Sequence, residues 1–277
     1  MALSVLFYGT RGQIMSVSSD RLIYGGHTPC LTVNEGEERL IVDAGFGISN
    51  LAHELMNGKN GPARNEFHIL LSHFHWDHIQ GLMYFSPIYF EHNRINVYTP
   101  FEVDVVKEVL NLLLDGSYSP FNGLASLPCT WNFVKLNGSN RVGPFNVSFH
   151  PTAHIGECYA YRITSDEGRV VYVTDHDARS SPANESLVAW AKDCDILIHE
   201  AMFTPSEYSL FPDLGHSSFI SAMENAQRIG APMTLLTHHA ARRNDSELAE
   251  HERYLEKLFN NRDRKLAFAR EGINYRL

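Results

Sequence analysis

Four side chains that can bind a metal ion lie within six residues of one another, at His73, His75, Asp77 and His78. An apolar run, Phe67 and Ile69–Leu71, precedes them and predicts a buried strand. Imidazole nitrogens and carboxylate oxygens together suit borderline divalent cations such as zinc, manganese or iron. The motif therefore predicts a metal site in a cleft at the end of a strand, with a histidine-rich surface loop as the alternative.

More histidines and acidic residues follow expected strands further along the chain. The strands expected at 147–150, 170–174, 195–198 and 233–237 lead in turn to His154, to Asp175, to His199 and Glu200, and to His238. Any one of these histidines alone would more often be a structural residue than a ligand. Their repeated arrival at strand ends is the pattern that a functional cleft at one edge of a sheet produces.

Strands and helices alternate along the chain, which favours an α/β or α+β layered fold. We expect further strands at 3–8, 28–33, 40–42, 159–164 and 169–173, and helices at 48–56, 101–114, 185–192, from Ser217 or Ser218 to 229, and after a cap at Ser246. Strands 159–164 and 169–173 should form a hairpin, and Gly9–Gly12 a tight turn. Because no repeat or linker interrupts the chain, we expect residues 1–277 to form a single domain.

The composition limits the classes of partner. The chain has 277 residues, a net charge of −9 and no long basic run, so we expect no extended nucleic-acid surface and no membrane binding. The cysteines are scattered without a C-x-x-C pair, which favours reduced thiols. We find no secretion signal and no apolar stretch of about 18 residues that could span a bilayer. These features predict a cytoplasmic protein.

The order of the candidate ligands resembles a known family, the metallo-β-lactamase fold hydrolases. That family carries H-x-H-x-D-H, then a lone histidine, a lone aspartate and a final histidine, and the resemblance covers nearly the whole chain. The matching residues are His73, His75, Asp77, His78, His154, Asp175 and His238. Other segments resemble the phosphodiesterase branch of the family, which includes ribonuclease Z and cyclic-phosphate phosphodiesterases. They are Gly9–Gly12, Tyr24–Thr28, Asp43–Gly45, His199–Ala201 and Gly215–Ser218.

The resemblance implies a four-layer αβ/βα sandwich with two divalent metal ions, expected to be Zn²⁺, with Mn²⁺ or Fe²⁺ as alternatives. By the same resemblance one ion is held by His73, His75 and His154. The other is held by Asp77, His78 and His238, and Asp175 bridges the two. Within the His238–His239 pair we choose His238 because it directly follows the expected strand.

The expected reaction is hydrolysis of a small cyclic or linear nucleotide-like phosphodiester, through attack of a metal-bound hydroxide on phosphorus. Asp77 and His216 are the predicted catalytic residues. His216 would protonate the leaving oxygen, its pKa lowered by the neighbouring helix N-terminus, or would only brace the Ser217–Ser218 turn. Asp43, His199 and Glu200 are expected to orient metal ligands or His216.

Several alternatives stay open. A tRNA 3′-processing endonuclease would use a long arm between His154 and Asp175, where this chain has room only for a hairpin. A lactone, thioester or β-lactam hydrolase could use the same metal centre, and a metal-binding protein without turnover is a further alternative. Arg11, Arg242 and Arg243 are candidate phosphate contacts, although each is better explained as a surface or packing residue. The resemblance also suggests a homodimer, whereas the natural substrate, the native metal and the oligomeric state are not fixed by the sequence.

Overall fold

Two β-sheets packed face to face form the centre of the computed structural model, which describes residues 2–58, 66–117, 119–259 and 264–277. In spatial order the first sheet contains β16 (Asn274–Arg276), β1 (Leu3–Gly9), β3 (Cys30–Glu35), β4 (Glu38–Val42), β5 (Glu66–Leu70), β6 (Arg94–Thr99) and β7 (Thr130–Lys135). The second contains β15 (Lys265–Phe268), β13 (Met233–Thr237), β12 (Ile196–Glu200), β11 (Gly168–Val173), β10 (Tyr159–Ser165), β9 (Phe145–Pro151) and β8 (Asn140–Val142).

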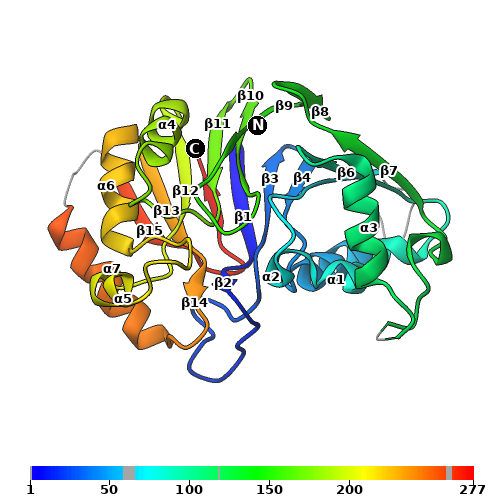
Figure 1. Ribbon diagram of the computed structural model, residues 1–277, viewed down its shortest axis with the longest axis horizontal. Helices are drawn as coiled ribbons and strands as arrows, with labels where there is room; N and C mark the ends of the chain where they lie inside the picture. The colour runs from blue at the N-terminus through cyan, green and yellow to red at the C-terminus, as the bar shows by residue number, and fades with distance from the viewer. Residues whose placement is uncertain (1, 59–65, 118, 260–263) are drawn as a thin grey trace.

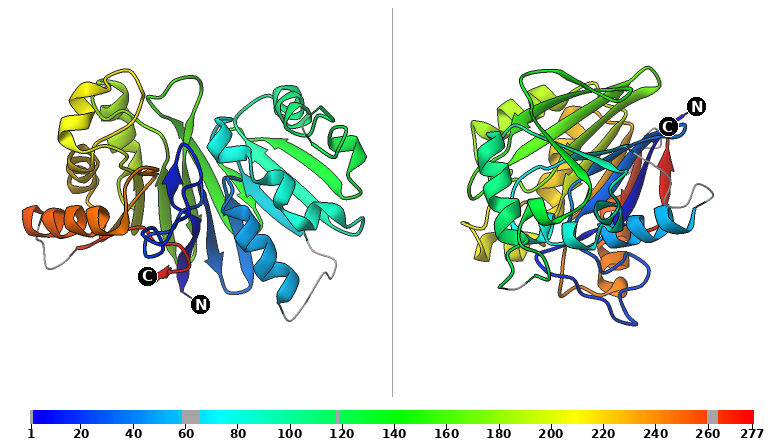
Figure 2. Two further views of the ribbon diagram at one scale, coloured as in Figure 1. Left: turned by 90° about the horizontal axis from the view of Figure 1, so that it is seen from below. Right: turned by 90° about the vertical axis from the view of Figure 1, so that its right-hand side faces the viewer.

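Helices cover the outer face of each sheet (Figure 1). The first sheet carries α1 (Ile48–Asn57) and α3 (Val103–Leu113), with the short α2 (Trp76–Ile79) near its edge. The second sheet carries α4 (Ala183–Ala191), α6 (Phe219–Ile229) and α7 (Asp245–Leu258), with α5 (Pro205–Leu210) nearby. The 3₁₀ turns are η1 (Leu82–Tyr84), η2 (Ser86–Tyr89) and η3 (Leu124–Ser126). Figure 2 shows the resulting order of helix, sheet, sheet and helix, so the predicted four-layer sandwich is confirmed.

Three hydrophobic cores separate the four layers. The core between the sheets contains Val5, Val33, Tyr161 and Ile163, all fully buried. A second core lies between the first sheet and α1 and α3, and a third lies between the second sheet and α4, α6 and α7. Because each strand presents alternate side chains to opposite faces, both faces of the two sheets are apolar. That residues 1–277 form one domain stays a prediction.

Parallel strands explain why ligand candidates gather at one edge. In the first sheet β4, β5 and β6 run parallel, and in the second sheet β11, β12 and β13 run parallel. Parallel neighbours end on the same side of a sheet, so the loops after β5, β11, β12 and β13 meet there. The predicted hairpin of β10 and β11 is confirmed, with Ser165 paired to Gly168.

Two local predictions were wrong. Gly9–Gly12 is not a tight turn, because Arg11–Gly12 forms the short strand β2 that pairs in parallel with β14 (His239–Ala240). The last helix is capped by Asn244 and not by Ser246: the Asn244 side chain accepts from the Glu247 amide, and the Glu247 side chain accepts from the Asn244 amide. For α6, Ser218 is the N-cap, and Gly230 ends the helix at φ 89°.

Candidate metal centre

The contiguous half of the site comes from one short segment, residues 73–78, which follows β5 and includes the start of α2. His75 precedes the first residue of α2, and Asp77 and His78 lie within that helix. Behind them Asp43, in the left-handed region at φ 60°, accepts hydrogen bonds from the Ser72 amide at 2.9 Å and from His78 Nδ1 at 2.8 Å. The Ser72 and Tyr172 hydroxyls also donate to the Asp43 carboxylate. Asp43 therefore fixes the orientation of this segment without facing the centre.

The dispersed half of the site comes from three separate segments of the second sheet. His154 follows β9, Asp175 follows β11 and His238 follows β13. His154 Nδ1 donates to the Gly215 carbonyl at 2.7 Å, and His238, at φ 60°, lies against Gly12 of β2. An added Cβ at Gly12 would come within 2.3 Å of the His238 ring, so this close approach requires glycine.

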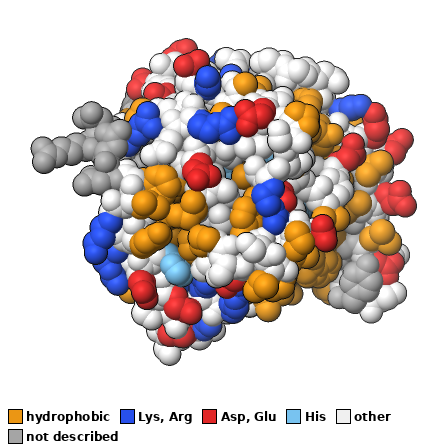
Figure 3. All heavy atoms as spheres, turned by 60° about the vertical axis from the view of Figure 1, so that its left-hand side comes forward, with side chains coloured by type: hydrophobic (Ala, Val, Ile, Leu, Met, Phe, Trp, Pro, Cys, Tyr) orange, Lys and Arg blue, Asp and Glu red, His pale blue; other side chains and the backbone are white. Residues whose placement is uncertain are grey.

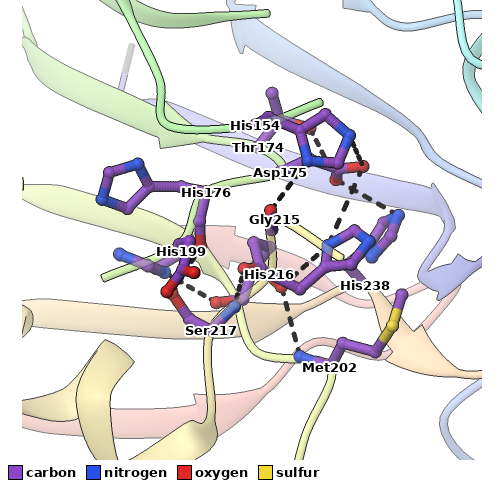
Figure 4. A network of polar contacts seen from close by, with 12 residues as sticks. His154, Thr174, Asp175, His176, His199, Met202, Gly215, His216, Ser217 and His238 are labelled. Atoms are coloured by element: carbon purple, nitrogen blue, oxygen red, sulfur yellow. Dashed lines mark hydrogen bonds and ion pairs between the residues drawn. The ribbon is translucent and has the colours of Figure 1, made fainter. Parts of the chain in front are cut away.

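The two halves meet around Asp175, and Figure 4 shows this side chain beside His154 and His238 of the dispersed half. One oxygen, Oδ2, lies 3.4 Å from His154 Nε2 and 3.6 Å from His73 Nε2. The other, Oδ1, lies 3.2 Å from His238 Nε2 and 3.6 Å from His78 Nε2. Each oxygen of this one carboxylate thus faces a different set of imidazoles.

Potential ligand atoms, one from each side chain, form two compact sets, and within each set the atoms all lie within 4.8 Å of one another. They are His73, His75, His154 and Asp175, and Asp77, His78 and His238. A third set of the same compactness joins His216 to Asp175 and His238. All seven predicted ligands are therefore close together, although their role as ligands stays a prediction.

The hydrogen bonds of the imidazoles fit a bound cation. His78 donates through Nδ1 to Asp43 and His154 donates through Nδ1 to Gly215, so in the neutral form of each ring Nε2 carries the lone pair. Those Nε2 atoms point at the Asp175 carboxylate. The nitrogen lone pair and the carboxylate oxygen would repel each other unless a positive charge lay between them. His73 Nε2 is also buried and has no hydrogen-bond partner among the described residues. The donor set therefore fits divalent cations.

The charges of the pocket favour a cation as well. Burial disfavours a charged His78, but Asp77, Asp175 and Asp43 outweigh burial and raise the pKa of this imidazole to about 10. A group of buried carboxylates thus attracts positive charge to this point, and a metal ion can supply that charge in place of a proton.

His216 and Glu200 lie beside the centre. His216 Nδ1 is 3.7 Å from Glu200 Oε2 and 4.0 Å from Asp175 Oδ2, and its ring stacks on His238 with centroids 5.1 Å apart. Burial lowers the pKa of His216 to about 3, more than Asp175 raises it. Burial, followed by the charge of Asp175, raises the pKa of Glu200 well above its usual value. Burial, and not the helix N-terminus that we expected, is the main cause of the lowered His216 pKa, and this imidazole is therefore uncharged at neutral pH.

Other predicted residues lie apart from the centre. His199 points to the opposite face of β12 from Glu200, because consecutive strand residues alternate, and it contacts Asn225 and the Glu200 carbonyl. Arg11 is fully buried and donates to the backbone carbonyls of Gly25 and Arg243. Arg243 donates to Glu207 and lies over the Phe219 ring, and Arg242 pairs with Glu207 at 2.5 Å. The three arginines therefore serve packing or surface contacts.

The sequence did not reveal several residues that support the centre. The backbone amide of Gln13 donates to Asp77 Oδ2 at 2.7 Å, and His176, directly after Asp175, accepts from the Ala153 backbone amide at 3.0 Å. The Gly12 contact with His238 was also unexpected. Only the glycine gave a signal, because a glycine can mark a close approach of two chain segments.

The chain is similar in sequence to known proteins. Residues 38–239 match the family model described as the Beta-lactamase superfamily domain. The chain is 28% identical over 218 residues to the probable metallo-hydrolase YhfI of Bacillus subtilis, covering 73% of this chain and 76% of that protein. It is also 28% identical over 288 residues to ribonuclease Z of Archaeoglobus fulgidus, covering 87% of this chain and 89% of that protein.

Solved structures share the fold. The crystal structure of YhfI from Bacillus subtilis superposes with a TM-score of 0.71 and 22% identity over the full length of both chains. A diphosphatase of the PhnP family superposes with a TM-score of 0.70 and 18% identity, covering 100% of this chain and 98% of that one. At these identities the structures establish the architecture and not the substrate. Within the part of the chain that the structure describes, no helix is both long and apolar enough to cross a membrane.

Proposed function

The chain belongs to the metallo-β-lactamase superfamily of hydrolases, and from this membership we propose that it is a metal-dependent phosphodiesterase. Its substrate would be a small cyclic or linear nucleotide-like phosphodiester. One observation carries the proposal: a seven-residue cluster around Asp175 lies next to the buried side chains of His216 and Glu200, whose Nδ1 and Oε2 atoms are 3.7 Å apart. The cluster suits binding of an anionic phosphoryl group, and the pair suits delivery of a proton.

In this proposal His73, His75 and His154 would hold one divalent ion, Asp77, His78 and His238 would hold the other, and Asp175 would serve both sites. Zn²⁺ is the expected metal, with Mn²⁺ or Fe²⁺ as alternatives, because imidazole suits zinc and iron and carboxylate suits manganese. Two such ions, when bound, lower the pKa of a water and carry the negative charge that develops on the phosphoryl group. Since only Asp77 and Asp175 contribute negative charge to the ligand set, the loaded site would keep a net positive charge that attracts an anion.

His216 and Glu200 would move the proton. The leaving oxygen gains negative charge as its bond to phosphorus breaks, and the Nε2–H of neutral His216 would donate to it. The carboxylic acid of Glu200 would then pass its proton to His216 Nδ1, 3.7 Å away. The Ser217 and Met202 amides donate to Glu200 and would stabilise the carboxylate that this step leaves.

A ribonuclease is the second candidate, because ribonuclease Z of Archaeoglobus fulgidus is among the relatives. Three features favour a small substrate instead. Between His154 and Asp175 the chain forms only the β10–β11 hairpin, with no protruding arm. The net charge is −9, and on the face shown in Figure 3 the Lys and Arg side chains are interspersed with Asp and Glu. A long polyanion needs a continuous basic surface for tight binding.

Changing His216 tests the proposed proton donor. We expect His216→Ala to lower kcat on bis(p-nitrophenyl) phosphate by about 10²- to 10⁴-fold, the usual contribution of a general acid. Zinc content, measured on the same protein, should be unchanged. Turnover close to that of the wild type with full metal content would remove His216 from the chemistry.

A substrate panel tests the reaction class. Cyclic nucleotides, linear diesters, a precursor tRNA, lactones and β-lactams would be offered to zinc- and manganese-loaded protein. Preference for a small diester supports the proposal, whereas preference for tRNA or for a lactone would replace it. We also propose a cytoplasmic location, supported by four buried cysteines without a disulfide, and a homodimer, which sedimentation would test.

A further inference from the structure

Four buried polar side chains form a continuous hydrogen-bonded chain behind the dispersed half of the centre. They are His176, which follows β11, Asn184 in α4, Asn225 in α6 and His199 in β12. All four are at most 5% exposed. In Figure 4 the rings of His176 and His199 point away from the cluster of His154, Asp175 and His238. We call this group the buried brace.

The proton position on His176 follows from its partners. Its Nδ1 lies 3.0 Å from the Ala153 amide, which can only donate, so Nδ1 is the acceptor. Nε2 therefore carries the proton and donates to Asn184 Oδ1 at 2.9 Å. Burial lowers the pKa of His176 to about 4, which agrees with a neutral ring in this position.

The donors and acceptors are matched along the rest of the brace. Asn184 and Asn225 exchange two amide hydrogen bonds, at 3.1 and 2.8 Å. The Asn225 amide also faces His199 Nε2 at 3.3 Å, so that nitrogen accepts and His199 Nδ1 donates to the Glu200 carbonyl at 2.6 Å. Every polar atom of these four side chains has a partner. A buried polar group without a partner would be costly, so complete matching is what lets this arrangement persist.

The brace is attached to the chain next to four functional residues, which are His154, Asp175, His216 and Glu200. Ala153 precedes His154, and His176 itself follows Asp175. The His176 carbonyl accepts from the Ser217 hydroxyl at 2.6 Å, and Ser217 follows His216. At the other end His199 precedes Glu200. Four loops that are distant in sequence are thus tied to one buried group of side chains.

We propose that the buried brace positions His154 and Asp175 of the dispersed half of the metal centre, with His176 as its central positioning residue. This inference rests on the proposed metal centre but not on the proposed phosphodiester substrate. An apolar core would fill the same space between α4, α6 and β12 at less desolvation cost, but would not fix the direction of these loops. The contiguous half needs no such brace, because its ligands share one short segment anchored by Asp43.

The test compares two substitutions at His176 with a matched control in α4. His176→Leu removes both hydrogen bonds, whereas His176→Asn keeps an acceptor near the Nδ1 position and loses the link to Asn184. Leu187→Ala opens a cavity at a fully buried residue of α4 without touching the brace. For each full-length protein we would measure Zn²⁺ affinity and stoichiometry by competition with a chromogenic chelator, the visible spectrum of the Co²⁺ form, and the thermal midpoint.

For His176→Leu we expect the weaker-bound Zn²⁺ to lose about 10- to 100-fold in affinity, the usual effect of removing a residue that orients ligands. The Co²⁺ spectrum should change as well. His176→Asn should lose less, and Leu187→Ala should lower the thermal midpoint with wild-type Zn²⁺ affinity. If His176→Leu does not fold, we expect the same loss of Zn²⁺ affinity for Asn184→Ala, because this change removes the hydrogen bonds of Asn184 to His176 and Asn225.

Unchanged Zn²⁺ affinity and Co²⁺ spectrum in these variants, with only a lower thermal midpoint, would overturn the positioning role. Equal losses of Zn²⁺ affinity in Leu187→Ala and His176→Leu would overturn it too. A wild-type protein that binds no Zn²⁺ would overturn both this inference and the proposed function. Loss of Zn²⁺ affinity on changing His176, together with no diester hydrolysis by the wild type, would support the brace and reject only the substrate.

Discussion

The two halves of the candidate centre are built in different ways. The contiguous half places its imidazoles and Asp77 on six consecutive residues, at the end of β5 and in α2, with Asp43 behind them. The dispersed half collects His154, Asp175 and His238 from loops after three different strands of the second sheet. Local chain geometry is enough to arrange the first, whereas the second depends on contacts between segments distant in sequence.

The difference explains where each half is vulnerable. Errors in the contiguous half would arise from changes within the motif or at Asp43. The dispersed half can also be disturbed from a distance, through Gly12 against the His238 ring or through the hydrogen bonds of His176. Changes outside the ligand set should therefore affect the dispersed half from more places in the sequence.

Among changes within the two halves of the centre, Asp175→Asn should give the largest effect, because its two oxygens face the imidazoles of both halves. We expect kcat on a chromogenic diester to fall about 10³-fold, the upper range for removing one electrostatic stabiliser. Metal content, measured by plasma mass spectrometry, should fall below two ions per chain. Turnover within tenfold of the wild type, with full metal content, would contradict the bridging position of Asp175.

Asp43→Ala should weaken metal binding through the contiguous half. The loss of its bonds to Ser72 and His78 should lower Zn²⁺ affinity by about 10- to 100-fold. Tyr172→Phe is the matched control, since it removes one donor to Asp43 and leaves the motif untouched. Chelator competition would measure both. Equal Zn²⁺ affinities in the wild type, Asp43→Ala and Tyr172→Phe would show that the contiguous half keeps its geometry without Asp43.

Gly12→Ala should disturb the dispersed half alone. The new methyl group would overlap the His238 ring, so that ring must move. We expect a loss of Zn²⁺ affinity of about tenfold, at the low end for a change that misorients a ligand. The hydrogen bonds of Asp43 should persist, which a crystal structure of the variant would verify. A variant with His238 in place and unchanged affinity would mean that the backbone yields instead.

The pH dependence of stability should have opposite signs for two groups of buried imidazoles in the metal-free protein. His78 has a folded pKa of about 10 against a usual 6.5, so its stabilising effect is complete below pH 6.5 and is lost as pH rises toward 10. Burial lowers the pKa of His199 and His239, in the second-sheet side of the molecule, to about 3. Their effect is complete above pH 6.5 and is lost as pH falls toward 3.

Each such imidazole should change the free energy of unfolding by up to about 1.4 kcal/mol per pH unit within its window. Urea unfolding of chelator-treated protein between pH 5 and pH 9 would measure the sum. The predicted result is a maximum near pH 6.5. A free energy of unfolding that rises steadily across this range would contradict the opposed signs.

Much of this architecture could be predicted from local sequence patterns. The H-x-H-x-D-H motif, the strand-end residues His154, Asp175 and His238, the β10–β11 hairpin and the Ser218 cap of α6 all depend on neighbours in sequence. Family resemblance supplied the two-sheet sandwich, because alternating strands and helices alone fit several layered folds.

Apart from the Ser246 cap, the predictions that failed depended on long-range contacts. Arg11–Gly12 is a strand only because β14 lies beside it, more than 200 residues later in the chain. His199 and Glu200 are both at the end of β12, and the packing of the sheet decides which of them faces the centre. His176 gave no signal of its own, since its partners belong to α4 and to the loop before His154.

The most direct test of the central claim is a crystal structure of the zinc-loaded protein with anomalous scattering recorded at the zinc edge. We expect two zinc peaks per chain, one among His73, His75 and His154 and one among Asp77, His78 and His238, with an oxygen of Asp175 next to each. A single peak, or zinc bound away from Asp175, would contradict it.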